Sequence, residues 1–249
     1  MAEKPARIAR FHVDVALRAG STVLLPEDAA HHAVHVLRLR PQDEVVLFNG
    51  RGGEFAGRLA AVDRLRVSID LLEHRAVERE SPLAVTLVQG VSSGEKMDFT
   101  VQKATELGVW ALQPVVAARS VGRLAGERAE LKRAHWRRVA IAACEQCGRN
   151  RVPEVRPVLA LADYCRQAGA EGSRLLLAPQ SRLGLRQAAG RLNGAVALAA
   201  GPEAGFEAAE EGELAQAGFT PVRLGPRVLR TETAALAALA ALNALAGDF

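Results

Sequence analysis

The chain has 249 residues, of which 49% are hydrophobic and 24% charged, enough for one large or two modest domains with buried cores. Its longest apolar run, Ala234 to Leu242, is too short to span a membrane, and no apolar segment follows the N-terminal residues as a secretory signal requires. Three cysteines, an odd number without a secretory context, indicate reduced thiols and a cytoplasmic protein.

The net charge of +4 is unevenly distributed along the chain. The stretch from Arg119 to Arg156 holds ten basic and four acidic side chains, whereas residues 1–80 balance twelve against twelve. A concentrated basic segment is expected of a surface that binds nucleic-acid phosphates. A solvated arginine-rich helix is the alternative.

Residues 1 to 75 carry short β-prone runs separated by tight turns. The predicted strands are Thr22–Leu25, Glu44–Phe48, Glu54–Val62 and Leu65–Leu72, with a helix from Pro26 to about Leu37. This spacing predicts a small β-barrel.

Two motifs in the chain invite a metal interpretation. His31 and His35 lie one helical turn apart, but no nearby cysteine or acid pair completes the four ligands that zinc prefers. Cys144 and Cys147 form a C-x-x-C without a second pair, and Gly148 fits the end of a helix there. We therefore expect no metal, and packed thiols at a helix end.

A charged linker over 73–81 precedes a change of pattern. The predicted elements are a strand Leu83–Val88, a helix to about Leu107, a strand Ala111–Val116 and a basic helix from Arg128 to about Gln146. Gly90 to Lys96 imitates a phosphate-binding loop but has the wrong glycine spacing, and no G-x-G-x-x-G follows a strand. Alternating strands and helices predict an α/β domain over 80–249.

Three apolar strands near the C-terminus each end in a loop. They are Leu175–Leu177, Ala195–Ala200 and Pro221–Leu224, and their spacing suits parallel βα units. The last loop leads to Thr231, a plausible helix N-cap, with Glu232 in the first turn. Polar groups and free backbone N–H groups therefore converge at one sheet edge, a usual place for ligands, although ordinary turns would look the same.

These loops carry a family resemblance. Gly201-Pro-Glu-Ala-Gly205 followed by Leu224–Ala234 resembles the cofactor loops of SPOUT methyltransferases, specifically the ribosomal RNA small subunit methyltransferase E family. His32–Arg40, Lys96–Gly108 and Glu145–Arg149 agree with it, in order along nearly the whole chain. One departure is Ala204, where the family usually has glycine. If that position required a positive φ, alanine would be strained there.

The resemblance implies a PUA-like β-barrel RNA-binding domain at 1–75 and a SPOUT domain with a deep trefoil knot at 80–249. It implies S-adenosylmethionine-dependent methylation of N3 of uridine 1498 in 16S ribosomal RNA, free or in the small ribosomal subunit, by a homodimer without a metal. Leucines spaced by three, from Leu236 to Leu245, make more than one helix face apolar, which fits a core or a subunit interface. A SPOUT enzyme acting on another RNA position or on ribose, or a non-catalytic RNA-binding assembly factor, is the alternative.

The same resemblance implies three sets of site residues. The cofactor set comprises Leu177, Pro179, Leu198, Gly201, Pro202, Glu203, Gly205, Leu224, Gly225, Arg227, Leu229, Arg230, Thr231, Thr233 and Ala234. The RNA-binding set comprises Arg7, Arg10, Arg38, Arg40, Arg137, Arg138 and Arg149. For catalysis, Arg230, Arg149 or Arg10 could stabilise the anionic base, and Glu232 or Glu145 could accept its proton. These alternatives stay open, and we favour the arginine because a carboxylate repels a nascent anion.

Overall fold

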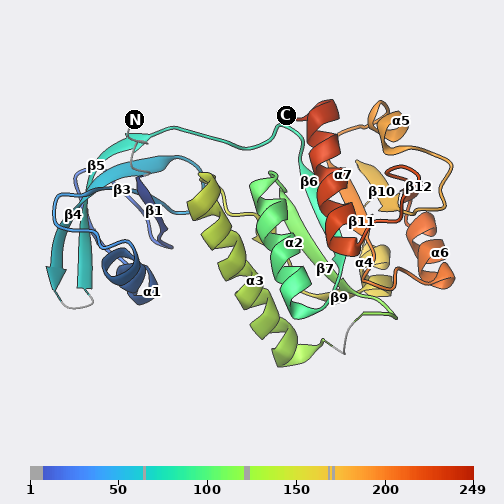
Figure 1. The fold of residues 1–249 in the computed structure, drawn as a ribbon, viewed down its shortest axis with the longest axis horizontal. Helices are drawn as coiled ribbons and strands as arrows, with labels where there is room; N and C mark the ends of the chain where they lie inside the picture. The colour runs from blue at the N-terminus through green and yellow to red at the C-terminus, as the bar shows by residue number, and fades with distance from the viewer. Residues whose placement is uncertain (1–7, 64–65, 121–123, 168, 170–171) are drawn as a thin grey trace. The chain divides into compact units, whose positions relative to one another are not determined.

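The computed structural model describes residues 8–63, 66–120, 124–167, 169 and 172–249 (Figure 1). The chain divides into two compact units. The first contains residues 1–80 and 144–152, and the second contains residues 81–143 and 153–249. The stretch 144–152 thus joins the first unit from a distance of more than sixty residues along the chain.

The first unit is built on a mainly antiparallel sheet. Its strands are β1 (Ala9–His12), β2 (Thr22–Leu24), β3 (Glu44–Phe48), β4 (Glu54–Asp63) and β5 (Arg66–Arg75), in the order β1-β3-β4-β5-β2. Only the β1–β3 pair is parallel among these described pairings. The strands expected from the sequence are present, but β5 continues to Arg75, so the linker begins later than Glu73.

The helix of the first unit changes type along its length. It begins as α1 (Glu27–His31) and continues as a π-helical turn, η1 (His32–Val36), in which the Leu37 N–H donates to the His32 carbonyl. The expectation of one regular helix to about Leu37 was therefore wrong in its second half. Arg38 then adopts a φ of 56°, which no continuing helix permits. The buried Ala30 and Ala33 belong to the same apolar core as Phe11 and Ile69.

A buried carboxylate ties residues 144–152 into the first unit. Glu54 Oε2 accepts hydrogen bonds from Arg10 Nη1 at 2.7 Å, from Arg79 Nη1 at 3.2 Å and from Asn150 Nδ2 at 3.2 Å. The same Asn150 amide also donates to the Val77 carbonyl at 2.6 Å. Burial alone would raise the pKa of Glu54, but these donors lower it below its usual range.

The second unit is organised around a parallel sheet, as the spacing of the strands predicted. Its strands are β6 (Val85–Gly90), β7 (Ala111–Val116), β8 (Glu154–Val155), β9 (Leu159–Ala160), β10 (Ser173–Leu177), β11 (Val196–Ala200) and β12 (Thr220–Val222). The order is β12-β10-β11-β6-β7-β8, with β9 also pairing β7, and every described pair is parallel. The carboxyl ends of β10, β11 and β12 therefore lie at one edge.

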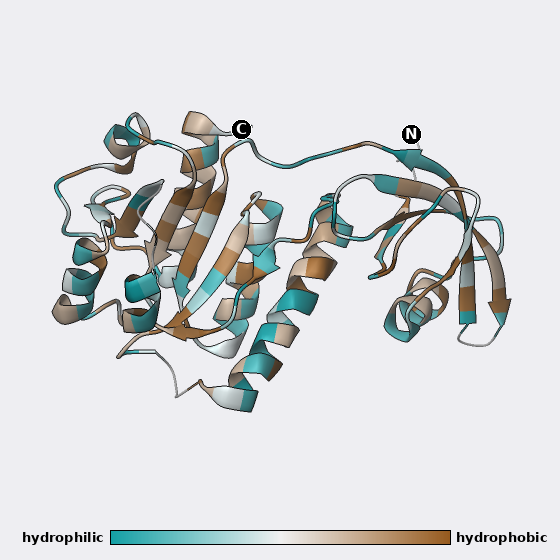
Figure 2. Ribbon diagram, turned by 180° about the vertical axis from the view of Figure 1, so that it is seen from behind, coloured by the Kyte–Doolittle hydropathy of each residue, from teal (hydrophilic) through white to brown (hydrophobic). Residues whose placement is uncertain are grey.

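Helices cover both faces of this sheet. They are α2 (Gly94–Glu106), α3 (Gly126–Cys147), α4 (Leu161–Gln167), α5 (Leu185–Ala189), α6 (Ala208–Gln216) and α7 (Thr231–Ala246). Leu161 of α4 and Leu214 of α6 share a buried cluster with Val88, Leu176 and Phe219. On the other face α7 packs against α2, β6 and β11, and apolar strands lie between the two helix layers (Figure 2). No described helix is long and apolar enough to cross a membrane.

Candidate functional site at the carboxyl edge of the parallel sheet

A pocket of about 270 Å³ opens where the strands β10, β11 and β12 end. The loops that follow these strands and the first turn of α7 form its walls. The lining residues are Leu177, Ala178, Pro179, Ala200, Gly201, Pro202, Glu203, Ala204, Gly205, Val222, Arg223, Leu224, Gly225, Arg227, Val228, Leu229, Thr231 and Ala234. The structure thus brings together segments that are up to 57 residues apart, from Leu177 to Ala234.

Most of the expected cofactor residues line this pocket, and three do not. Leu198 is fully buried within β11, whereas Arg230 and Thr233 are exposed and lie outside the lining. The lining also contains residues that the expected cofactor set omits: Ala178, Ala200, Ala204, Val222, Arg223 and Val228. Ala178, Ala204 and Val228 fall within the expected loops, where a small or apolar side chain gives no individual signal. Ala200, Val222 and Arg223 fall in expected strands. In the structure β11 ends at Ala200, and β12 ends at Val222, two residues before the expected end at Leu224.

The loop after β11 turns through glycine rather than through Ala204. Gly205 has a φ of +73°, and a Cβ on Gly201 would lie 3.0 Å from the Phe206 nitrogen. Among the described residues, the non-glycine positions with positive φ are Arg38 and Gln42. Ala204 therefore does not have a positive φ, and alanine causes no backbone strain at this position, where the family usually has glycine.

Glu203 anchors this loop to the start of α2. Its Oε1 accepts hydrogen bonds from the Ser93 backbone N–H at 2.9 Å and from Lys96 Nζ at 3.3 Å. Although partial burial would raise the pKa of Glu203, the Ser93 N–H and the Lys96 ammonium lower it. A carboxylate at the positive end of a helix is favourable in any case.

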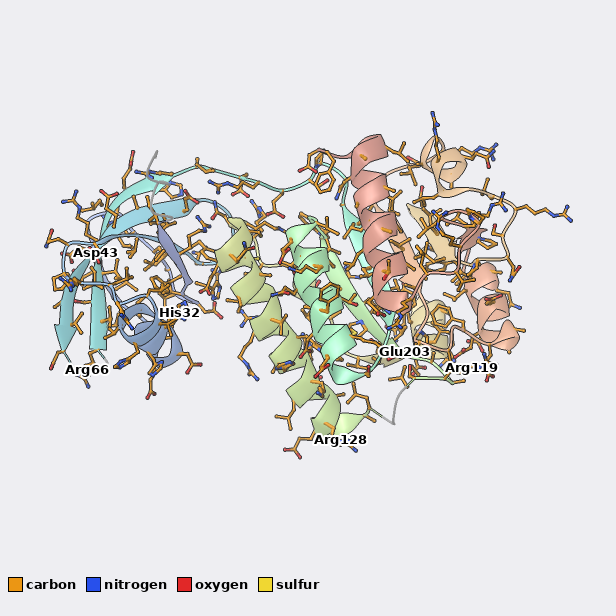
Figure 3. The ribbon with its side chains drawn as sticks, in the orientation of Figure 1. His32, Asp43, Arg66, Arg119, Arg128 and Glu203 are labelled. Atoms are coloured by element: carbon orange, nitrogen blue, oxygen red, sulfur yellow. The ribbon has the colours of Figure 1, made fainter. Side chains whose placement is uncertain are left out.

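Arg119 holds the far side of the same loop. Its Nη1 donates to the Ala204 carbonyl at 3.1 Å, and its Nε pairs with Glu207 Oε1 at 3.3 Å. Arg119 lies in the segment after β7, and Glu203 lies in the loop after β11. Figure 3 shows both residues at the same edge of the second unit. Part of the basic segment therefore supports the pocket instead of facing solvent freely.

The first turn of α7 differs from the expected cap. Arg230, not Thr231, is the N-cap residue, and it makes no side-chain capping bond. Thr231 is the first helical residue, and its hydroxyl donates to the Gly201 carbonyl across the pocket wall. Beside it, Glu232 Oε2 is buried without a hydrogen-bond partner among the described residues.

The other candidate catalytic residues, Glu145, Arg149 and Arg10, belong to the first unit. Glu145 Oε1 accepts a hydrogen bond from the His12 backbone N–H at 2.9 Å, and burial raises the pKa of this carboxyl. Arg149 is 4% exposed and pairs with Glu80, Nε to Oε1 at 3.1 Å. Glu145 and Arg149 therefore lie in a different unit from Arg230 and Glu232.

The expected RNA-binding arginines have varied environments. The Arg10 side chain is 9% exposed, pairs with Glu54 and stacks on Phe48, with its guanidinium carbon 5.1 Å from the ring centroid. Arg38 and Arg40 are exposed in the first unit, and Arg137 and Arg138 are exposed on α3. Arg7 lies outside the described residues. Phosphates can reach the exposed arginines. Arg10 and Arg149 instead form ion pairs with Glu54 and Glu80 of the same unit.

The metal-like motifs form no ligand cluster. Within the described parts of the chain, no group of three or more His, Cys, Asp or Glu side chains is placed to hold a metal ion. Cys144 is buried, its Sγ donates to the Arg151 carbonyl at 3.5 Å, and burial raises the pKa of its thiol to about 12. Such a thiol is unreactive at neutral pH.

Comparison with known proteins places these features in a family. Residues 79–243 match the family described as RNA methyltransferase domain, and residues 25–72 match RNA methyltransferase PUA domain. The ribosomal RNA small subunit methyltransferase E of Buchnera aphidicola from Schizaphis graminum is 31% identical, covering 97% of this chain and 98% of the relative. The Bacillus subtilis protein of that name is 33% identical, covering 89% and 90%.

A solved structure agrees along the whole fold. The ribosomal RNA small subunit methyltransferase E from Neisseria gonorrhoeae, bound to S-adenosyl methionine, is 39% identical, with a TM-score of 0.89 and coverage of 98% of this chain and 100% of that one. The α/β second unit and the PUA-like first unit fit this match. The chain belongs to the ribosomal RNA small subunit methyltransferase E family.

Proposed function

We propose that this protein transfers a methyl group from S-adenosylmethionine to N3 of uridine 1498 in 16S ribosomal RNA. The observation that carries the proposal is the pocket at the carboxyl ends of β10, β11 and β12, formed by the loops that carry the family resemblance. The similar protein from Neisseria gonorrhoeae binds S-adenosyl methionine, which supports the same cofactor here.

The residues present fit that cofactor. Gly205 and Gly225 line the pocket with φ of +73° and +132°, and a Cβ on either would meet no atom within 4 Å, so open space adjoins the backbone. Leu177, Leu224 and Leu229 supply apolar walls for a flat adenine ring. Exposed backbone N–H and C=O groups of the loops can read its edges.

The cofactor supplies an electrophilic methyl group, so the protein has to orient uridine N3 and favour its deprotonated form. Arg230 is exposed at the N-cap of α7, next to the pocket residues Leu229 and Thr231. We assign it the stabilisation of the N3 anion. Glu232, with one buried and unpartnered carboxylate oxygen, is the alternative as proton acceptor.

The substrate is held through its phosphates. Arg137 and Arg138 on α3 and Arg38 and Arg40 in the first unit are exposed cations. We propose that they bind 16S ribosomal RNA, free or within the small ribosomal subunit, in the cytoplasm. We further propose a homodimer that covers the C-terminal helix, where Leu245 is 46% exposed although Leu239 and Leu242 are buried within the unit.

Methyl transfer to purified RNA tests the proposed activity. Small ribosomal subunits and free 16S RNA from cells lacking the gene are incubated with the protein and labelled S-adenosylmethionine, and the digested nucleosides are separated. Label in 3-methyluridine supports the proposal. Label in another nucleoside or in a ribose-methylated nucleoside would favour another SPOUT activity, and RNA binding without transfer would favour an assembly factor.

A further inference from the structure

A buried glutamine at the end of β6 connects two walls of the pocket without lining it. Gln89 is 1% exposed. Its Nε2 lies 3.0 Å from the Gly90 carbonyl, 3.3 Å from the Gly201 carbonyl and 3.1 Å from Thr231 Oγ1. Because carbonyl oxygens only accept hydrogen bonds, these neighbours fix which end of the amide is the nitrogen.

The hydrogen-bond directions form one connected set. The Thr231 hydroxyl donates its only proton to the Gly201 carbonyl, so its oxygen is free to accept from Gln89. The Gly201 carbonyl, in the loop after β11, is thereby held by Gln89 and by the first residue of α7 together.

Close packing beside the amide reinforces this link. A Cβ on Gly90 would lie 2.5 Å from Pro202 Cδ and 2.9 Å from the Gly201 carbonyl carbon. The backbone of β6 therefore touches the loop directly at the point where the Gln89 amide bonds to it. Few other arrangements of this loop would keep both the contact and the hydrogen bonds.

We propose that Gln89 is a positioning residue for the cofactor site, which fixes the loop Gly201–Gly205 against the first turn of α7 before the ligand arrives. The inference rests on the proposed function, because it takes S-adenosylmethionine as the ligand of this pocket. A preorganised pocket binds more tightly, since the ligand does not bear the cost of ordering the loop. Loss of the amide should thus weaken cofactor binding although Gln89 contacts no ligand.

The sheet offers a matched control on the neighbouring strand β7. Gln113 is 4% exposed, and its Nε2 donates to the next carbonyl, Pro114, at 3.0 Å and to the Pro157 carbonyl at 2.9 Å. It resembles Gln89 in burial and in bonding to the following residue, but it bonds to Pro157, which is not among the residues that line the pocket. Gln113→Leu therefore measures how far the loss of any buried strand amide lowers stability and cofactor affinity.

The test measures S-adenosylmethionine affinity by calorimetry, with thermal unfolding of the free proteins alongside. Gln89→Leu should weaken binding about tenfold or more, whereas Gln113→Leu should bind like the wild type even if both lower stability. In steady state the KM for the cofactor should rise in Gln89→Leu and the KM for RNA should not. Equal affinity of Gln89→Leu and wild type, or an equal loss in both variants, would overturn the inference.

Variants at Thr231 keep the test decisive if Gln89→Leu does not fold. Thr231→Ser retains the hydroxyl and should bind nearly as wild type, whereas Thr231→Val removes the link to Gly201 and should weaken binding. Equal affinity in these two variants would contradict the proposed arrangement. If the wild type itself binds no S-adenosylmethionine, the proposed function fails instead, and the role of Gln89 fails with it.

Discussion

Glu54 combines deep burial with several cationic or amide donors. Its side chain is 7% exposed, and its partner Arg10 is 9% exposed. Removing the carboxylate would leave the Arg10 guanidinium buried without its ion-pair partner, and such losses typically cost about 3 kcal/mol or more. We expect Glu54→Ala to lower the free energy of unfolding by about that amount in denaturant titrations. Glu44→Ala, which removes a pair exposed by 48% and 63%, should cost about 1 kcal/mol or less.

The same carboxylate predicts how stability depends on pH. Because the folded-state pKa of Glu54 lies below its unfolded value, its contribution is fully present above the unfolded pKa. It is lost as the pH falls through the folded pKa. The variant Glu54→Gln should have a lower free energy of unfolding than the wild type near neutral pH. The difference between the two should become smaller as the pH falls below about 4.5. A deficit that stays constant through this range would show that the charge of Glu54 contributes nothing.

The pH dependence of the chemical step distinguishes Arg230 from Glu232. If the site captures the uridine anion beside Arg230, the single-turnover rate should rise about tenfold per pH unit from about pH 6 to about pH 9, towards the pKa of the base. If Glu232 is the general base, the rate should instead reach a plateau as the pH rises. We expect the first, with a large rate loss in Arg230→Ala. A plateau near neutrality that disappears in Glu232→Gln would make Glu232 the base.

At the level of the loops, glycine conformation sets the pocket. Gly225 has a φ of +132°, which residues with a side chain rarely adopt. In Gly225→Ala the loop should either keep this conformation at a cost of about 1 to 3 kcal/mol or change its conformation. We expect calorimetry to show at least about tenfold weaker S-adenosylmethionine binding. Gly212→Ala is the control, because that site in α6 is also open around the Cβ but has no positive φ. Unchanged affinity in folded Gly225→Ala would remove this loop from the site.

Helix α3 carries the prediction for RNA affinity. If Arg137 and Arg138 bind phosphates, their replacement by alanine should weaken binding to all RNA sequences alike. The slope of log affinity against log salt concentration should also become less negative, by about 0.7 for each lost phosphate contact on single-stranded RNA. Replacing Arg186 and Arg191, exposed residues at α5, removes equal charge elsewhere. The prediction fails if both pairs change the slope equally, or if neither changes it.

The elements differ in how far their sequences predicted them. Short β-prone and apolar runs predicted the strands, and the spacing of the apolar runs predicted the parallel sheet, because strands buried on both faces are continuously apolar. The π-helical turn His32–Val36 and the N-cap at Arg230 had no such signal, since both depend on tertiary contacts. Threonine is a common N-cap residue, yet the Thr231 hydroxyl donates a hydrogen bond to the Gly201 carbonyl, thirty residues away.

At the scale of the whole chain, long-range partners were the hardest to predict. Residues 144–152 join the first unit because Asn150 bonds to Glu54, 96 residues away, and Arg149 to Glu80. Isolated polar side chains carry no periodicity that would reveal such pairing. The trefoil knot stays a prediction, because strand order and pairing do not describe threading. The place of the pocket was predictable because its loops follow apolar strands, whereas most of its lining residues were implied by the family resemblance.

Mass mapping of 16S ribosomal RNA tests the central claim most directly. Cells lacking the gene are compared with cells that carry the wild type, Gly225→Ala or Gly212→Ala. We predict that uridine 1498 gains one N3 methyl group with the wild type and with Gly212→Ala, and that it loses most of this modification without the gene or with Gly225→Ala. A fully methylated uridine 1498 in the deletion strain, or a methyl group missing from a different nucleotide, would contradict the account.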